Sequence, residues 1–289
     1  MTPVRIRHTD VPIHSWTGPD DVPGIQEAGV LASELVLAGA TMPPEILTQR
    51  AVSFEVVETP TPGWRELRTP RARVQGDAPI EGLRTSGVYA EELNALLQTA
   101  LGGDAVVIYH VKLFNDQQAF RKIATLAQAP NAESYYAPNT QEMVFWFGQY
   151  ATPELFQRAF AHEFTHAYMD RVWGIRQPLW FAEGMAEYFS NLEWIDNQLV
   201  AGGSNPRAIA LLLNLVPLSR FLMLTRGEFY DHVEFPYHYA QAWALIHFLY
   251  NRKPQLVDEL LRKGMVRGLG IEGLDTAFRN YVERTLKGS

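Results

Sequence analysis

One stretch, residues 152–191, constrains the fold of this chain more than any other part of its sequence. It opens with T-P-E-L-F-Q-R-A-F-A-H-E-F-T-H and later reads P-L-W-F-A-E-G-M-A-E-Y-F-S-N. Thr152 suits the N-cap of a helix, Pro153 suits its first turn, and Gly174 suits its end. The sequence therefore predicts a long helix that begins at Pro153 and stops before Gly174.

Within this helix, His162 and His166 are four residues apart, so they lie one turn apart on the same face. Their imidazoles can converge on one metal ion, and Glu163 stands beside them to activate a water molecule. The alternative interpretation is a pair of core histidines on an amphipathic helix. This interpretation is less favoured because a pair of carboxylates, also four residues apart, follows the histidine pair in the sequence.

The carboxylate pair lies on another predicted helix, which begins at Pro178. Its members are Glu183 and Glu187, four residues apart. Residues 167–182 connect His166 to Glu183, which is enough chain to end one helix, turn and bring a carboxylate back to the histidines. Two imidazoles, one carboxylate and one open position make a catalytic zinc site rather than a closed structural one.

The spacing also predicts which faces of these helices are buried. The two histidines share a sector with Leu155, Ala159 and Trp173, and the adjoining apolar stripe comprises Phe156, Phe160, Phe164 and Ala167. We expect the sector of the histidines to be buried, and Glu154, Arg158 and Thr165 to point away from it. Gly184 has no side chain, so it is expected to let the two helices approach closely.

The motif H-E-F-T-H followed by P-L-W-F-A-E-G-M-A-E-Y resembles the gluzincin metallopeptidases. The resemblance is closest to the peptidase MA-like group of bacterial proteins, where W-x-x-E-G-x-A follows the H-E-x-x-H helix. It extends over about residues 105–285. It implies an α+β, zincin-like (thermolysin-like) fold with a mixed β-sheet N-terminal lobe and a mainly helical C-terminal lobe. It also implies one Zn²⁺ per chain and the cleavage of peptide bonds.

The resemblance gives a role to each residue of the motif. His162, His166 and Glu183 would hold Zn²⁺, because the glutamate of E-G-x-A is the ligand in that family. Glu163 would act as the general base. Glu187 would accept the free N–H of a ligating histidine and so orient its ring.

A tyrosine is expected to complete the site. In gluzincins a later helix opens with a tyrosine whose hydroxyl reaches the substrate oxyanion. Residues 236–250 are predicted to form such a helix, with Tyr239 in this role. Tyr237 and His238 remain alternatives, and His238 is also a candidate substrate contact. A Tyr239 that only packs in the core is a further alternative.

A strand, a helix and a second strand are predicted directly before the motif, over residues 105–114, 116–127 and 142–147. By the resemblance, Met143–Phe147 would be the sheet edge above the metal. Such an edge can bind an extended peptide as an added strand. The candidate substrate contacts on it are therefore Val144, Phe145 and Trp146. An ordinary core strand is an equally good interpretation.

The resemblance favours an endopeptidase. Gluzincin aminopeptidases carry G-x-M-x-N on the edge strand to hold the substrate's α-amine, whereas this chain has T-Q-E-M-V-F-W. Glu142 is kept as a candidate amine anchor. Two other functions stay open, a zinc amidase that acts on a peptide-like metabolite or precursor and a non-catalytic zinc-binding scaffold. Glu163 counts against the scaffold, because a structural site needs no general base.

Two regions are expected along the chain, residues 1–104 without an assigned role and residues 105–289 as the zincin-like domain. The elements predicted in the first region are a short helix near residues 29–39, a strand over 51–58 and a helix over 89–101. After Asn191 the chain is expected to be mostly helical.

Composition narrows the partners and the location. A net charge of −7 argues against nucleic acid as the main partner. The resemblance implies a peptide or protein substrate instead. The chain has no cysteine, which excludes disulfides and thiolate ligands. It shows no run that predicts a membrane span and no apolar signal-peptide core. We therefore expect a cytoplasmic location, or a secreted or periplasmic one if a signal peptide was removed. The oligomeric state is left open.

Overall fold

A computed structural model describes residues 4–7, 24–28, 52–103, 106–127, 129, 132–174, 177–195, 198–264 and 270–288. The short helix expected near residues 29–39 lies outside them. The fold is of the α+β kind and divides into two compact units. The sheet unit comprises Val4–Val172 and Glu193–Val200, and the helical unit includes Trp173–Leu192 and Ala201–Ser289. No described helix is both long enough and apolar enough to cross a membrane.

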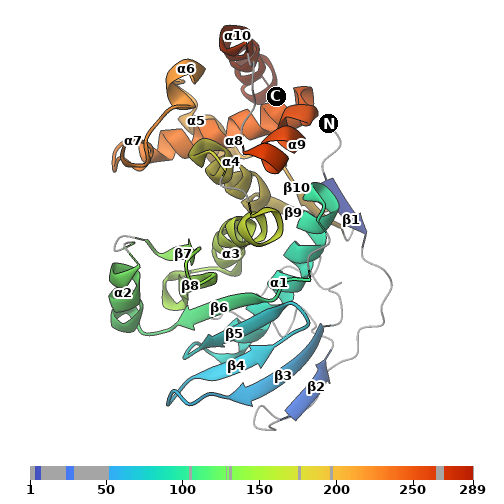
Figure 1. The fold of residues 1–289 in the computed structure, drawn as a ribbon, viewed down its shortest axis with the longest axis vertical. Coiled ribbons are helices and arrows are strands. Elements are labelled where there is room, and N and C mark those ends of the chain that lie inside the picture. Colours follow the sequence, from blue (N-terminus) through green and yellow to red (C-terminus); the bar gives the residue numbers. More distant parts are fainter. Residues whose placement is uncertain are drawn as a thin grey trace. The chain divides into compact units, whose positions relative to one another are not determined.

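The sheet unit is built on a mixed sheet of seven strands, whose order is β2-β3-β4-β5-β6-β8-β7 (Figure 1). The strands are β2 (Gly24–Ala28), β3 (Val52–Glu58), β4 (Arg65–Arg68), β5 (Ala72–Gly76), β6 (Tyr109–Phe114), β7 (Ser134–Ala137) and β8 (Glu142–Trp146). The neighbours β5, β6 and β8 run parallel, and the other pairs are antiparallel. The strands predicted near residues 51–58, 105–114 and 142–147 are confirmed as β3, β6 and β8. Strands from both sides of residue 104 share this sheet.

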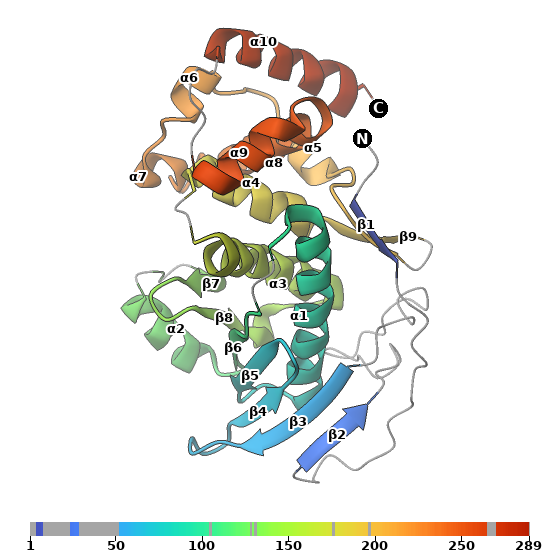
Figure 2. The same cartoon turned by 45° about the vertical axis from the view of Figure 1, so that its right-hand side comes forward.

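Helix α1 (Ile80–Leu101) packs against β3 to β6 on one face of this sheet (Figure 2). It ends where the sequence predicts, because Gly102 adopts a φ of +73° that suits glycine. It begins nine residues before the predicted start at residue 89. Gly87 explains its close approach, since a Cβ there would lie 2.9 Å from the side chain of Thr69 on the sheet side.

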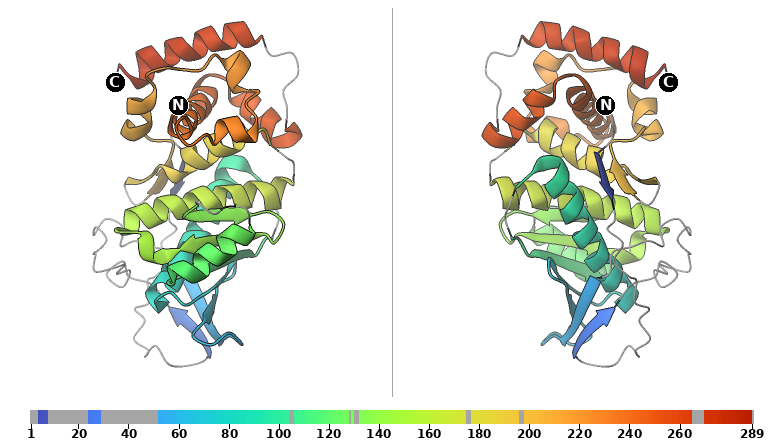
Figure 3. Two further views of the ribbon diagram at one scale, coloured as in Figure 1. Left: turned by 90° about the vertical axis from the view of Figure 1, so that its left-hand side faces the viewer. Right: turned by 90° about the vertical axis from the view of Figure 1, so that its right-hand side faces the viewer.

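Helix α3 (Pro153–Tyr168) carries the motif and lies against β7 and β8 (Figure 3). Its start is confirmed, because the Thr152 hydroxyl accepts a hydrogen bond from the N–H of Leu155 at 3.4 Å. A π-helical turn, Met169–Trp173, extends α3 before Gly174 turns the chain at a φ of +60°. The predicted apolar stripe is also buried, and Phe160 stacks on Phe145 of β8 with ring centroids 5.3 Å apart.

Two details of the predicted helix faces are wrong. Leu155 is 49% exposed, and His162 and His166 are only half-buried, so their sector is not fully covered. Thr165 is fully buried instead of pointing away, and its hydroxyl donates to the carbonyl of Ala161 at 2.8 Å. A threonine satisfied by its own helix can be buried without a further partner, which helical spacing alone does not predict.

The two faces of the sheet are covered by different helices. Met143 and Phe145 of β8 are buried on the face of α3, which also packs against α1. The alternate residue Val144 belongs to a separate cluster with Phe120 of α2 (Gln117–Leu126). The helix predicted over residues 116–127 is confirmed as α2, and Asp116 caps it by accepting a hydrogen bond from the N–H of Ala119.

The helical unit is arranged around two helices packed on each other, α4 (Leu179–Ser190) and α8 (Phe235–Arg252). The other helices are α5 (Pro206–Leu211), α6 (Leu218–Phe221), α7 (Arg226–Phe229), α9 (Pro254–Lys263) and α10 (Ile271–Tyr281), followed by a π-helical turn over Val282–Leu286. This confirms the mostly helical character predicted after Asn191. A small sheet of β1 (Val4–Arg7), β10 (Gln198–Ala201) and β9 (Leu192–Ile195), most of whose residues belong to the sheet unit, was not predicted.

Gly184 serves the packing of α4 on α8. A Cβ at Gly184 would lie 2.7 Å from the carbonyl oxygen of Ala242 and 2.7 Å from Cγ1 of Ile246. The sequence predicted that Gly184 would bring α4 close to the helix of the histidines. The partner it permits is α8 instead.

Candidate metal centre

His162 and His166 are held side by side on α3. Their Nε2 atoms lie 3.2 Å apart. Two nitrogens bound tetrahedrally to one zinc ion at the usual bond lengths would be roughly 3.3–3.4 Å apart. The same distance also suits a hydrogen bond from one neutral imidazole to the other. The separation is therefore compatible with one tetrahedral ion and with a direct hydrogen bond between the rings.

Glu183 is the buried carboxylate of α4. It is 5% exposed, and the hydroxyl of Tyr230 donates a hydrogen bond of 2.5 Å to its Oε1. The helix begins beside Pro178, as predicted, so Glu183 lies one turn into α4. A buried carboxylate is costly unless it is hydrogen-bonded or binds a cation, and the tyrosine meets part of that cost.

The ligand atoms of His162, His166 and Glu183 all lie within 4.8 Å of one another, so the three residues form a group that could hold a metal ion. This is the set that the sequence predicts. Neutral imidazoles and a carboxylate are ligands that Zn²⁺ accepts, although other divalent metals bind the same donors. The donor set and the spacing of the histidines fit zinc.

Glu163 follows His162 and is 8% exposed. Its Oε1 accepts a hydrogen bond of 3.0 Å from the hydroxyl of Ser134, at the start of β7. The contact was not predicted, because Ser134 is far from the motif in sequence and lies in a strand without a marked pattern. It gives the expected general base a fixed partner.

A comparison of this chain with protein-family models finds no match, and a comparison with curated protein sequences finds none either.

Tyr239 and His238, near the start of α8, were expected to contact the substrate. Tyr239 is half-buried, and its ring lies 5.7 Å from that of Phe229 and 6.3 Å from that of Tyr230. His238 is buried, and its Nδ1 lies 2.9 Å from the carbonyl of Phe229, to which it donates. This contact ties His238 to α7 and does not support its expected role as a substrate contact. The oxyanion role of Tyr239 stays a prediction.

The expectation that Met143–Phe147 forms the sheet edge is wrong. β8 is paired with β6 on one side and β7 on the other, and β7 is the terminal strand among those described. The side chains of Val144 and Phe145 are buried in the core, and Trp146 is half-buried. These three residues therefore lose the basis on which they were expected to contact substrate.

The sequence also predicts roles for two other carboxylates, Glu142 as an amine anchor and Glu187 as the acceptor of a histidine N–H. Glu142 forms an ion pair of 2.8 Å with Lys112 of β6. In β8 it alternates with Met143, so it lies on the face away from α3 and does not suit an amine anchor beside Glu163. Glu187 is half-buried on α4, and its predicted bond to a histidine stays a prediction.

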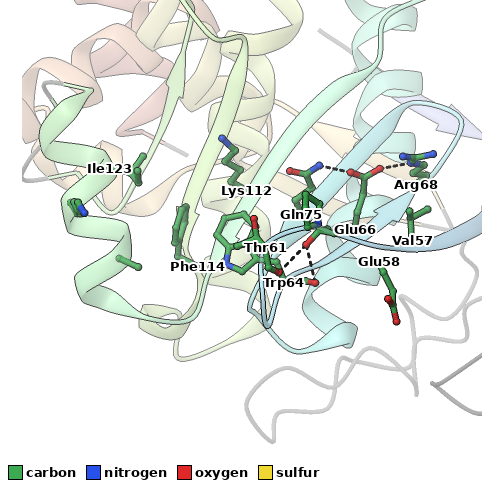
Figure 4. Close-up of a pocket in the computed structure, with 14 residues that line it drawn as sticks. Val57, Glu58, Thr61, Trp64, Glu66, Arg68, Gln75, Lys112, Phe114 and Ile123 are labelled. Atoms are coloured by element: carbon green, nitrogen blue, oxygen red, sulfur yellow. Dashed lines mark hydrogen bonds and ion pairs between the residues drawn. The ribbon is translucent and has the colours of Figure 1, made fainter. Parts of the chain in front are cut away.

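A pocket of about 580 Å³ lies on the face of the sheet away from α3, between the β3–β4 turn and α2 (Figure 4). Its polar floor is Glu66, which accepts hydrogen bonds from Arg68 and Gln75. Burial opposes ionisation of Glu66, but these bonds outweigh it and lower its pKa. Trp64 and Phe114 form an apolar wall, with ring centroids 5.1 Å apart. The Glu66 carboxylate is already hydrogen-bonded to Arg68 and Gln75. The pocket therefore gives no basis for predicting whether a ligand would be positively or negatively charged.

Proposed function

We propose that this chain is a zinc-dependent peptidase with a zincin-like catalytic arrangement of the gluzincin type. The observation that carries the proposal is the 3.2 Å separation of the His162 and His166 Nε2 atoms, in one group with Glu183. The buried, hydrogen-bonded Glu163 beside this group supports a hydrolytic role over a purely structural one. The resemblance of the H-E-x-x-H and E-G-x-A segments to that family supports it further.

The proposed mechanism divides the work among the residues. His162, His166 and Glu183 would hold the ion. Zn²⁺ bound there would supply Lewis acidity, which polarises a carbonyl and lowers the pKa of water towards about 7. Glu163 would take a proton from the attacking water and return it to the leaving amine. The hydroxyl of Tyr239 would donate to the developing oxyanion, a contact of a kind typically worth about 3 kcal/mol.

The sheet edge next to Glu163 favours an extended peptide as the substrate. β7 is paired on one side only among the described strands, and its first residue contacts Glu163. An extended peptide can add to such an edge through main-chain hydrogen bonds. Because Glu142 is paired with Lys112 on the other face, no amine anchor is evident on β8. We therefore propose cleavage within chains, as an endopeptidase does.

The decisive experiment compares the wild type with Glu163→Gln. Both zinc-loaded proteins are incubated with a mixed peptide library, and the products are read by mass spectrometry. Glutamine keeps the shape of glutamate but cannot take up the proton, so zinc content should persist while cleavage disappears. Equal cleavage by both proteins would show that Glu163 is not the base.

The library also separates the other two candidate functions. A scaffold would cleave nothing while still binding zinc tightly. An amidase of small peptide-like molecules would leave the long peptides intact but hydrolyse short acyl amides added to the same mixture. Internal cleavage of long peptides by the wild type alone supports the endopeptidase.

A further inference from the structure

Ser134 joins the terminal strand of the sheet to the helix of the motif. Its hydroxyl donates to Oε1 of Glu163 at 3.0 Å, across 29 positions of the sequence. Two residues on, the hydroxyl of Tyr136 donates to Oδ2 of Asp170 at 2.6 Å, which holds the same strand to the turn that follows α3. β7 is therefore fixed to α3 by one side-chain hydrogen bond and to the π-helical turn after α3 by another, both from one face of the strand.

A second layer lies behind Ser134. The hydroxyl of Tyr150 is hydrogen-bonded to the side chains of Ser134 and Gln149. With its amide nitrogen turned towards Glu133, Gln149 donates to that carboxylate at 3.0 Å. The Tyr150 hydroxyl has a single proton, which it donates to Ser134 when Ser134 donates its own proton to Glu163. Burial raises the pKa of the Tyr150 hydroxyl, so it keeps its proton. The contact between Ser134 and Glu163 is thus part of a hydrogen-bonded chain and not an isolated surface contact.

The main-chain groups of Ser134 point to the side of β7 on which no described strand pairs. The N–H of Trp146 donates to the carbonyl of Glu133 at 3.1 Å, so these two residues form a hydrogen-bonded pair. Such pairs alternate along an antiparallel ladder. The next residue, Ser134, lies opposite Phe145 in a pair that is not hydrogen-bonded, so its N–H and C=O point away from β8.

From these contacts we propose that Ser134 is a positioning residue, which orients the Glu163 carboxylate at the point where an extended substrate backbone pairs with β7. The inference rests on the proposed function, since it gives Glu163 the role of general base. The bond from Ser134 fixes Oε1, and we assign the proton transfer to Oε2. Ser134 would pair with the substrate through its main chain and orient the Glu163 carboxylate through its side chain.

Loss of the hydroxyl should therefore affect turnover more than binding. In the Ser134→Ala variant the carboxylate can rotate away from its productive orientation, whereas the main-chain groups of residue 134 still pair with a peptide. We expect kcat to fall roughly 10–100-fold and KM to change by less than about 2-fold, because misplacement of a catalytic group costs on this order.

The experiment uses the zinc-loaded full chain and a peptide that the wild type cleaves. Ser134→Thr restores a hydroxyl and should keep kcat within a few-fold of the wild type. Tyr135→Phe is the matched control, because it removes a hydroxyl from the adjacent residue, whose ring packs towards Phe120 on the other face. Its kcat should equal that of the wild type. A Ser134→Ala variant with wild-type kcat would overturn the inference.

Crystal structures of the wild type and Ser134→Ala give a readout that needs no activity. The inference expects one orientation of the Glu163 carboxylate in the wild type and a rotated or split one in the variant. An unmoved carboxylate would contradict it, even if the protein cleaved no peptide. Conversely, a wild type that cleaves nothing contradicts the proposed function alone, and so the two failures can be told apart.

Discussion

The hydroxyl of Tyr230 donates a hydrogen bond of 2.5 Å to Oε1 of Glu183, across 47 positions of the sequence. A bond this short to a carboxylate is at the strong end of the range for protein hydrogen bonds. It constrains how the only carboxylate of the candidate metal group can turn. Groups that orient a metal ligand in this way commonly determine affinity for the ion.

We therefore predict that Tyr230→Phe weakens zinc binding roughly 10–100-fold without loss of fold, because it removes the hydroxyl but keeps the ring. Competition with a chromophoric chelator measures the affinity. Tyr237→Phe is the control, since Tyr237 is exposed near the start of α8. Equal zinc affinity of the Tyr230 variant and the wild type would mean that the bond does not position a ligand.

The assignment of the third ligand is tested by two further variants on α4. Glu183→Gln should abolish tight zinc binding, because it removes one of three protein ligands. Glu187→Gln should weaken binding by only roughly 10–100-fold, as expected for a residue that orients a histidine. Zinc titration measures the affinity of these two variants and of His162→Ala, which should also lose the ion. The losses of affinity rank the three residues. A greater loss in the Glu187 variant would reverse the assignment.

The parts of the site that the sequence predicted depend on local chemistry. Thr152 and Pro153 start α3 and Gly174 ends its extension, because caps and turns are set by residues that are close in sequence. The four-residue spacing of His162 and His166 likewise brings their imidazoles together whatever surrounds the helix.

The partners of these residues could not be predicted, because they come from distant segments. Ser134 lies in S-Y-Y-A, a strand with four half-buried residues and no apolar alternation that would mark its position in the sheet. Tyr230 follows a one-turn helix capped by Thr225 and Glu228, and nothing near it indicates a carboxylate partner. The strand order placed β7 outside β8, and only tertiary pairing determines that order.

Gly184 offers a test of helix packing. Gly184→Ala should destabilise the fold by about 1–3 kcal/mol, because a Cβ would lie 2.7 Å from the Ala242 carbonyl of α8. Gly273→Ala is the control, since Gly273 lies in α10 with no atom within 4 Å of an added Cβ. There the better helix propensity of alanine should stabilise by up to about 1 kcal/mol. Urea unfolding measures both, and equal stability of the two variants would exclude close packing at Gly184.

His247 of α8 should make the protein sensitive to acid. Burial lowers its pKa to about 4, and its Nδ1 lies 2.8 Å from the Tyr281 hydroxyl. In the unfolded chain the pKa is about 6.5. Between these values the unfolded state binds more protons, so stability should fall as the pH falls from about 6.5 to about 4. Above about 6.5 both states are neutral, and below about 4 both are charged, so the contribution of His247 stops changing.

Removal of this imidazole should therefore flatten the response to acid. His247→Gln keeps an amide donor and acceptor but does not titrate, so its urea midpoint should drop less than that of the wild type between pH 7 and pH 4.5. His162 and His166 are unchanged in both proteins, and the difference isolates His247. His232→Gln is the control, because the side chain of His232 is 90% exposed. It should keep the wild-type slope, and the same slope in the His247 variant would mean that His247 does not govern the acid response.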